Sequence, residues 1–469
     1  MTIMLAYPIA YIYNQKYVIQ QPNASREARN TYILLSGLAL AFFFNSFEII
    51  HSLITIAVSY YICYITDRFY HNRRVSALLV WIFNLLYLMI GYYFYASDGY
   101  DIGWTTTQCV LCLRLLGFSM DFMDGAIMKD NKTTPSTMKS SEKKISGPHS
   151  FPSDSPLEKL PKLKDVYAYC FFPSAFLIGP QFSFSLYNRF LSSTGPYNRQ
   201  KIVDKKALMH TKRAQKNYIN RCLMIGIIYI ILLQTIGAIY PTSYILTPEF
   251  SNQSFLKKLV EFWICGKMVF VKYVGVWLLT EGACTYFGIT YQEGDENTAP
   301  SFSGLANSRP LEFELSTSIE HLVPNFNINT NLWVKHYVFK RLRFLGNKDL
   351  SQLGALLFLA IWHGFHFNYF QTFLLEFLFV VAERIIRARF YVPFVKPWID
   401  QDTTCLYAWK LIAWLTATTC FNYAIVGFDL LTLARGIKAY NQIYWLIHLL
   451  TLFVFIVHLT IGKKKLSTK

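Results

Sequence analysis

Long apolar segments recur along this chain, separated by short polar connections, and this pattern constrains its fold more than any other feature. A helix needs about 20 apolar residues to cross a bilayer core of about 30 Å. Charged residues make up only 16% of the chain, against about 25% in soluble domains. We therefore predict an all-α polytopic membrane protein, a single membrane domain over residues 1–469 with about nine to eleven transmembrane helices. The predicted spans are Tyr32–Ile49, His51–Ile65, Ala77–Tyr95, Thr106–Phe122, Ala168–Tyr187, Tyr218–Tyr240, Leu259–Leu279, Leu353–Val381, Leu406–Val426 and Ile443–Ile461.

The positive charge of the chain also fits a membrane protein. The formal net charge is +17, and Lys and Arg lie mainly in the connections between apolar runs. Basic connections face the cytosol and anionic lipid headgroups. We interpret the charge as an interaction with the lipid bilayer and predict no nucleic-acid partner. Two interpretations of the basic stretch from Tyr197 to Arg221 remain open. It is either a cytosolic interfacial segment or a surface that attracts a polyanionic substrate such as a coenzyme A thioester.

One polar segment interrupts the pattern between residues 129 and 164. It is rich in Lys, Ser, Pro and Thr and has few apolar side chains. A stretch of this composition cannot bury enough apolar surface to order itself. We predict a flexible polar loop within the membrane domain, away from any active site.

The nine cysteines do not predict a metal site. Cys109 and Cys112 form a CxxC pair, but no second pair or nearby histidine completes a zinc site. Most of the others lie within apolar runs. We expect no metal and interpret the pair as helical spacing on one face of a membrane helix.

A histidine lies near the middle of the predicted span Leu353–Val381. His363 is about 12 residues past Ser351, or about 18 Å along a helix, and an ionisable group at that depth is costly unless it serves a function or has a polar partner. Gly364 leaves room for a substrate chain or a neighbouring helix. His366, three residues later, is expected on nearly the same face as a supporting polar contact.

Two interpretations of His363 remain open from the residue alone. It is either a core histidine that hydrogen-bonds another helix or a functional group. A neutral imidazole can accept a proton near neutral pH, which is what a general base needs to activate a hydroxyl.

A cluster of asparagines precedes this span. Four of them occupy alternate positions and offer amide donors to a bent segment, where one could hold a substrate hydroxyl or stabilise an oxyanion. A turn before the next helix is the simpler alternative. The following residues have an amphipathic pattern, with Trp333 and Tyr337 near one face, and are expected on or partly in the membrane. The four asparagines are Asn325, Asn327, Asn329 and Asn331.

Four acidic residues lie in or beside apolar runs. Asp121 and Asp124 stand near the end of a predicted span, where we expect them to anchor a helix end or a loop. Glu281 and Glu376 lie deeper, and we expect each to pair with a neighbouring polar group.

Six motifs, in the same order along nearly the whole chain, resemble the membrane-bound O-acyltransferase (MBOAT) family. Together they look like its lysophospholipid acyltransferase 5, or lysophosphatidylcholine acyltransferase, branch. A lone Trp-His-Gly would be unspecific, whereas six ordered motifs are a strong signal. The motifs are Arg114–Gly125, Leu177–Ser183, Trp277–Gly282, Asn325–Trp333, Phe339–Gln352 and Trp362–Gly364.

The resemblance implies a fold with a buried catalytic chamber and a reaction in phospholipid remodelling. A long-chain, polyunsaturated acyl group would pass from acyl-CoA to the free sn-2 hydroxyl of lysophosphatidylcholine, or of lysophosphatidylethanolamine or lysophosphatidylserine. It further implies a multi-pass protein of the endoplasmic reticulum membrane, no cofactor beyond the acyl-CoA substrate, and a homodimer as one open assembly.

By motif position, the resemblance makes His363 and Asn327 the catalytic pair. His363 would take the hydroxyl proton, and Asn327 would position the hydroxyl or stabilise the transition state. The residues expected to bind substrate or support the pair are Asn331, Trp333, Trp362, Gly364 and His366.

Other functions stay open at this point. An MBOAT that acylates a sterol or a protein is disfavoured by the Phe339–Lys348 motif, which those branches generally lack. A transporter or channel could also use a histidine at mid-membrane depth, but no inverted repeat is evident. An inactive scaffold is disfavoured because both candidate catalytic residues are present.

The tail carries no di-lysine signal at the usual spacing, so the endoplasmic reticulum address is implied by the family alone.

Overall fold

The computed structural model describes residues 2–21, 23–95, 103–132, 151, 155–192, 205–293 and 300–460. Within these ranges the chain forms helices and two isolated β-bridges, without a β-strand, which confirms the predicted all-α class. The N-terminal helices are α1 Thr2–Tyr13, α2 Arg26–Asn45, α3 Ile49–Tyr70, α4 Arg73–Tyr95, α5 Trp104–Lys132, α6 Leu163–Cys170 and α7 Phe184–Ser192. The following helices are α8 Lys205–Ile239, α9 Pro248–Ser251, α10 Phe255–Phe287, α11 Pro310–Glu314, α12 Ile319–Leu322, α13 Ile328–Val334 and α14 Lys348–His363. The last helices are α15 Phe367–Ile386, α16 Lys396–Ile399, α17 Thr403–Leu430, α18 Leu433–Asn441 and α19 Leu446–Thr460.

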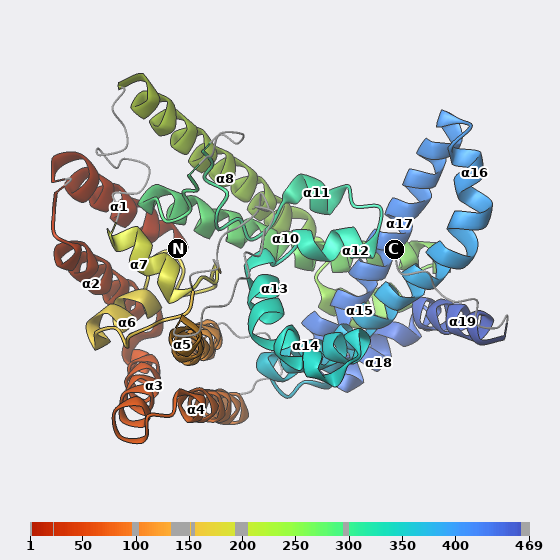
Figure 1. Cartoon of the computed structure of the whole chain (residues 1–469). Coiled ribbons are helices and arrows are strands. Elements are labelled where there is room, and N and C mark those ends of the chain that lie inside the picture. Colours follow the sequence, from red (N-terminus) through yellow and green to blue (C-terminus); the bar gives the residue numbers. More distant parts are fainter. Residues whose placement is uncertain are drawn as a thin grey trace.

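The helices form two groups with a central layer between them. Figure 1 shows α1 to α7 on one side and α15 to α19 on the other, with α10, α13 and α14 between the two groups. Helix α10 packs against α1 of the first group and against α17 of the second, so it connects the groups. This arrangement leaves the candidate site where the two groups meet.

Five helices of the described ranges are long and apolar enough to cross a membrane, or six if the bent pair α18 and α19 counts as one span. This confirms a polytopic membrane protein, with fewer such helices than the nine to eleven expected. The difference arises because some apolar runs are not single helices. The run Ala168–Tyr187 contains α6, a series of turns and α7.

The predicted continuous span Leu353–Val381 is a second such case, and here the prediction was wrong. Helix α14 ends at His363, and α15 begins only at Phe367. The break follows from Gly364, whose φ of 124° is a backbone conformation that side-chain-bearing residues rarely adopt. His363 therefore lies at a helix end, and His366 lies beyond the break, at the N-cap position of α15, so the helical spacing that predicted a shared face does not apply.

The polar regions between spans are described only in part. Of the predicted flexible loop 129–164, residues 133–150 and 152–154 lie outside the described residues. Its last part is held to the N-terminal helices, since Arg73 donates to the carbonyls of Leu157 and Glu158. Of the basic stretch Tyr197–Arg221, residues up to 204 lie outside the described residues, and the rest begins α8.

The segment after the asparagine cluster packs inside the protein. The side chains of Trp333 and Tyr337 are each only 1% exposed. The Trp333 indole donates to the carbonyl of Leu113 at 2.9 Å, and the Tyr337 hydroxyl donates to Asp121 at 2.7 Å, so both face α5. These two side chains therefore pack against protein, and the expectation that the segment lies on or partly in the membrane stays a prediction.

The acids of α5 have the anchoring role that the sequence predicted. Asp121 accepts the Tyr337 hydroxyl, and Asp124 forms a two-pronged ion pair with Arg341, in which the Nη1 to Oδ1 distance is 3.0 Å. These contacts fix the segment leading into α14 against the N-terminal group of helices.

Arg114 joins two of the motifs. Its guanidinium is buried and donates to backbone carbonyls at the end of α6 and in the turns that follow it, at Tyr169, Cys170, Ala175 and Pro180. Such bonds satisfy carbonyls that no regular helix can pair. The motif on α5 and the motif around Leu177–Ser183 are therefore neighbours in space, and residues of the second motif line the site described next.

Candidate functional site

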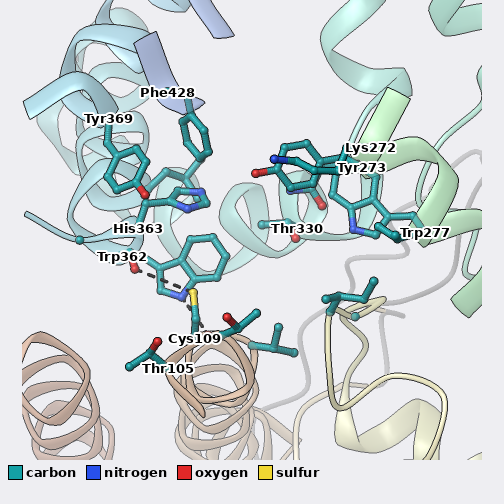
Figure 2. Close-up of a pocket in the computed structure, with 18 of the residues that line it drawn as sticks. Thr105, Cys109, Lys272, Tyr273, Trp277, Thr330, Trp362, His363, Tyr369 and Phe428 are labelled. Atoms are coloured by element: carbon teal, nitrogen blue, oxygen red, sulfur yellow. Dashed lines mark hydrogen bonds between the residues drawn. The ribbon is translucent and has the colours of Figure 1, made fainter. Parts of the chain in front are cut away.

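A cavity of about 730 Å³ lies between the two groups of helices. Its walls come from α5, the turns after α6, α10, the segment around α13, the break between α14 and α15, and α17. Figure 2 shows His363 beside Tyr369 and Phe428 on one side of this cavity, with Tyr273 and Trp277 on the other. The volume lies within the range of about 300–1,000 Å³ that is typical of ligand sites.

His363 stands in a ring of aromatic side chains. The centroid of its imidazole lies 4.9 Å from that of Phe428, 5.5 Å from Tyr369 and 5.7 Å from Phe373. No residue in the described part of the chain hydrogen-bonds its ring nitrogens, and His363 lines the cavity. Packing thus fixes the position of the imidazole while its nitrogens stay free for a ligand. Within the described ranges His363 therefore does not hydrogen-bond another helix, which was one of its two interpretations.

The helix end that carries His363 is anchored to α4 and α5. The Trp362 indole donates to the carbonyl of Cys109 at 3.0 Å, and the Tyr92 hydroxyl donates to the carbonyl of Trp362 at 3.2 Å. The second bond satisfies a carbonyl that the end of α14 leaves unpaired. A Cβ at Gly364 would lie 3.3 Å from the Tyr92 ring, so Gly364 lets the neighbouring helix approach, as predicted.

Asn327 lies on the same cavity, although it is 36 positions away in the sequence. It precedes α13 in a left-handed backbone conformation with a φ of 48°. Asn tolerates this conformation better than most residues. Its Oδ1 accepts a hydrogen bond from Nδ2 of Asn307 at 3.3 Å. The fold therefore brings the two predicted catalytic residues into one chamber.

The predicted supporting residues divide into two groups. Trp362, Gly364, His366 and Asn331 all line the cavity. Asn331 also donates through Nδ2 to the carbonyls of Val323 and Phe326, which closes the turn before Asn327.

Trp333 is different, because it does not line the cavity. Its indole faces Leu113 and stacks near Trp81 and Phe358, with ring centroids 6.2 and 5.6 Å away. Trp333 therefore supports the segment around Asn327 through packing and does not face the space available to a ligand.

The two membrane-embedded glutamates behave differently. Glu281 accepts from the Tyr218 hydroxyl and from the backbone N–H of Asn307, as expected of a paired acid. Glu376 lines the cavity, and within the described ranges its carboxyl has no hydrogen-bond or ion-pair partner. The expectation of a polar partner for Glu376 was wrong, because its neighbours on the cavity wall include the rings of Phe373 and Phe421.

Sequence reasoning missed a charged pair at the cavity. Lys272 of α10 lines it and forms an ion pair with Asp429 of α17, with 2.8 Å between Nζ and Oδ1. Thr242 donates to the other oxygen of Asp429 at 2.6 Å. The available signal was a lysine and an aspartate within apolar runs, where charges usually serve a function or pair with each other.

The arrangement can support proton transfer within a mainly apolar chamber. An imidazole with free nitrogens can accept a proton from a hydroxyl, and a nearby amide can stabilise a developing negative charge. Within the ranges that the structure describes, no cluster of three His, Cys, Asp or Glu side chains could hold a metal ion. An imidazole and an amide side chain are the groups at this site that such acid–base chemistry uses.

Comparison with known proteins supplies the wider context for this site. The family model described as MBOAT, membrane-bound O-acyltransferase family, matches residues 89–428, a range that includes both Asn327 and His363. The chain is 33% identical to lysophospholipid acyltransferase 5 of Drosophila melanogaster, covering 94% of this chain and 82% of that protein. It is 31% identical to the protein of the same name in Mus musculus, covering 95% and 85%. A lysophospholipid acyltransferase of Schizosaccharomyces pombe is 27% identical, covering 87% and 76%.

Proposed function

Because this chain belongs to the membrane-bound O-acyltransferase family, we propose that it transfers a long-chain acyl group from acyl-CoA to a lysophospholipid. The acceptor is the free sn-2 hydroxyl of lysophosphatidylcholine, lysophosphatidylethanolamine or lysophosphatidylserine, and the preferred acyl group is polyunsaturated. The product is a membrane phospholipid, so the reaction serves phospholipid remodelling. The relatives named lysophospholipid acyltransferase support this choice of acceptor.

The observation that carries the proposal is the pairing of His363 with Asn327 in one cavity. The imidazole is fixed by ring contacts and its nitrogens are free, which suits a general base. The cavity walls are rich in aromatic and aliphatic side chains, which suits the acyl chains of both substrates.

The proposed reaction balances with these two residues. His363 takes the hydroxyl proton while the hydroxyl oxygen attacks the thioester carbonyl carbon and forms the new C–O bond. The carbonyl oxygen becomes negatively charged in the tetrahedral intermediate, beside Asn327. The C–S bond then breaks, the carbonyl re-forms, and the coenzyme A thiolate takes the proton from the imidazolium. The products are the diacyl phospholipid and free coenzyme A.

Two charged groups of the cavity wall suit a zwitterionic acceptor. Glu376 offers a carboxyl group without a protein partner in the described ranges, and a choline or ethanolamine headgroup beside it would favour its charged form. Lys272 carries the opposite charge and can approach a phosphate while its ammonium group also pairs with Asp429. A sterol has neither charged group, so these residues favour a phospholipid acceptor.

The proposal is tested by acyl transfer from arachidonoyl-CoA to lysophosphatidylcholine in microsomes that contain the full chain. We expect His363→Ala to lower the rate by at least about 100-fold, because general-base catalysis typically contributes that much or more. His210→Ala is the matched control, since His210 is exposed on α8 and does not line the cavity. Full activity of a normally expressed His363→Ala protein would show that the catalytic assignment is wrong.

The same preparation tests the acceptor and the alternatives. A panel of lysophospholipids, a sterol and a peptide acceptor should give product only with the lysophospholipids. Transfer to a sterol or peptide at a comparable rate would favour another branch of the family. Ion flux through liposomes without acyl transfer would favour a transporter.

The cellular setting is part of the proposal. We expect the chain to fractionate with endoplasmic reticulum membranes, where lysophospholipid acceptors are remodelled. A homodimer is tested by chemical crosslinking in those membranes, and a band at the mass of one chain alone would contradict it.

A further inference from the structure

Asn307 is a buried residue outside every predicted site, and it connects Asn327 to the rest of the fold. Its side chain is 2% exposed and donates through Nδ2 to Oδ1 of Asn327 at 3.3 Å. Its backbone N–H donates to Glu281 at 3.2 Å, and its backbone carbonyl accepts from Ile328 at 2.9 Å. The backbone of Asn307 is thus hydrogen-bonded both to α10, through Glu281, and to Ile328, the residue after Asn327.

The orientation of the Asn307 amide follows from Asn329. The backbone N–H of Asn329 lies 3.1 Å from Oδ1 of Asn307, and Nδ2 of Asn329 lies at the same distance. A backbone N–H can only donate, so the atom that faces it must be the acceptor. Nδ2 of Asn307 therefore points the other way, toward Asn327. Asn329 is itself fixed, since its Nδ2 also donates to the carbonyls of Leu305 and Ala306 at 3.1 Å.

The orientation of the Asn327 amide follows in turn. An amide NH₂ can only donate, so the Asn327 atom that faces Asn307 is its Oδ1. Nδ2 of Asn327 is then the atom that remains, and it has no hydrogen-bond partner among the residues described. Asn327 lines the cavity. It therefore presents a hydrogen-bond donor, and not an acceptor, to a ligand.

A donor at this place suits one of the two roles that the sequence left open. A donor on the attacking hydroxyl oxygen would withdraw electron density from that oxygen and weaken it as a nucleophile. A donor on the thioester carbonyl oxygen would instead strengthen as negative charge develops there. The geometry therefore favours stabilisation of the oxyanion over positioning of the hydroxyl.

We infer that Asn307 is a positioning residue, which holds Asn327 so that its amide N–H groups point at the oxyanion of the acyl-transfer reaction. This inference rests on the proposed function, because it assigns a role within that reaction. Glu281 supports the arrangement from α10, where it accepts from the backbone of Asn307 and from the Tyr218 hydroxyl of α8. The chain of contacts runs from Tyr218 through Glu281 and Asn307 to Asn327.

Two substitutions of Asn307 separate positioning from a merely structural role. Asn307→Ala removes the donor and leaves the Asn327 amide free to rotate. Asn307→Asp places an acceptor opposite Asn327, so the Asn327 amide turns its NH₂ toward residue 307 and its oxygen toward the cavity. Positioning predicts a loss in kcat of about tenfold for Asn307→Ala and about 100-fold for Asn307→Asp. The KM values for both substrates should stay within about twofold of wild type, because the lost interaction forms only in the transition state.

A structural role predicts the opposite order. Asp is nearly the same size as Asn and keeps the acceptor for the backbone N–H of Asn329, whereas Ala leaves that N–H unpaired. The full chain is purified, reconstituted in phospholipid nanodiscs and assayed with arachidonoyl-CoA and lysophosphatidylcholine, with rates expressed per folded protein. If Asn307→Asp were as active as wild type, or more active than Asn307→Ala, the inference would be wrong.

Asn84→Asp is the matched control for the cost of a buried charge. Asn84 is fully buried on α4, and its amide donates to Ser59 and to the carbonyl of Val80, away from the cavity. We expect less folded Asn84→Asp protein but an unchanged kcat for the protein that folds. A loss of kcat as large as that of Asn307→Asp would overturn the inference.

A variant of Asn327 tests whether its Nδ2 group acts as the donor, even if Asn307→Asp does not fold. Asn327→Asp keeps an acceptor for Asn307 but presents a carboxylate oxygen to the cavity in place of the NH₂. We expect a loss in kcat of about 100-fold with normal folding, and an unchanged kcat would exclude the donor role.

In the Asn327→Ala background, Asn307→Asp should add less than about a twofold loss, because coupled residues are not additive. A full multiplicative loss would show that Asn307 acts independently of Asn327.

The outcome also distinguishes this inference from the proposed function. Full activity of His363→Ala would refute the proposed reaction at this cavity. An inactive His363→Ala together with a normal Asn307→Asp would leave the reaction intact and refute only the role of Asn307.

Discussion

The two candidate catalytic residues are held in contrasting ways. The His363 side chain has ring contacts and no hydrogen bond within the described ranges. Asn327 is held by a hydrogen bond from Asn307, which belongs to a continuous network through Asn329 and Glu281. The difference teaches that a base and a donor need different support. A base must keep its acceptor nitrogen free, whereas an amide must be prevented from turning over.

Both regions lie where regular helices end. His363 closes α14 before Gly364, and Asn327 precedes α13 in a left-handed conformation. Irregular backbone within a membrane protein is tolerated where it is buried or lines a cavity, because its polar groups must find partners. At the end of α14 the carbonyl of Trp362 accepts from the Tyr92 hydroxyl, and beside Asn327 the backbone N–H groups of Ile328 and Asn329 donate to Asn307.

Removing the side chain of Asn327, the catalytic candidate that is held by a hydrogen bond, should have the largest effect on activity. We expect Asn327→Ala to lower kcat by about 100- to 1,000-fold, which is the usual loss when one oxyanion donor is removed. KM for acyl-CoA and for the lysophospholipid should change little. The measurement is steady-state acyl transfer by purified protein, and a rise in KM without a change in kcat would point to ground-state binding instead.

Gly364→Ala should displace the neighbouring His363 from its aromatic contacts by straining the backbone. A φ of 124° and a Cβ at 3.3 Å from Tyr92 make the substitution strained, at a cost of about 1–3 kcal/mol. We expect lower thermal stability in detergent and a loss of activity, because His363 precedes the strained residue. Gly346→Ala is the matched control, since Gly346 also has a positive φ, 68°, but no atom near its Cβ position. The control should lose stability and keep the activity of its folded fraction.

Trp333→Phe should affect stability and not substrate affinity. The substitution removes the indole N–H that donates to Leu113 while it keeps an aromatic ring, so we expect a loss of about 1 kcal/mol in unfolding free energy. Unchanged KM values would agree with its position away from the cavity. Trp398→Phe is a control on the surface, where the side chain is 70% exposed and no loss of stability is expected. A rise in KM for Trp333→Phe would show that Trp333 contacts substrate after all.

The smallest effect should come from Glu376, which resembles His363 in having no hydrogen-bond partner for its side chain among the described residues. We expect Glu376→Gln to reduce the preference for cationic headgroups over an uncharged lysophospholipid headgroup by about three- to tenfold in kcat/KM, as for a single partly screened charge. Competition between such acceptors in one assay measures the ratio directly. Glu383→Gln is the matched control on the same helix, because Glu383 accepts from the backbone of Ile319 and Glu320 and does not line the cavity. An equal shift in both variants would argue against a headgroup site.

The sequence by itself determined the class of the protein and the identity of the candidate catalytic pair. Apolar runs with few charges require lipid as a solvent, so an all-α membrane protein followed from composition and length alone. Six ordered motifs indicated the family, and within them Asn327 and His363 could be selected. The anchoring role of Asp121 and Asp124 also followed from their place near the end of a span.

Only the tertiary structure decided how these residues are held. The helix break at His363 could not be predicted from hydropathy, because a glycine within an apolar run does not interrupt that run, and only the folded backbone shows its φ of 124°. The orientation of the Asn327 amide depends on Asn307, which lies 20 positions earlier and has no catalytic signature of its own. Lys272 and Asp429 likewise meet only because α10 packs on α17. Hydropathy records which residues avoid water, whereas the direction of a hydrogen bond is set by partners that only the folded chain brings together.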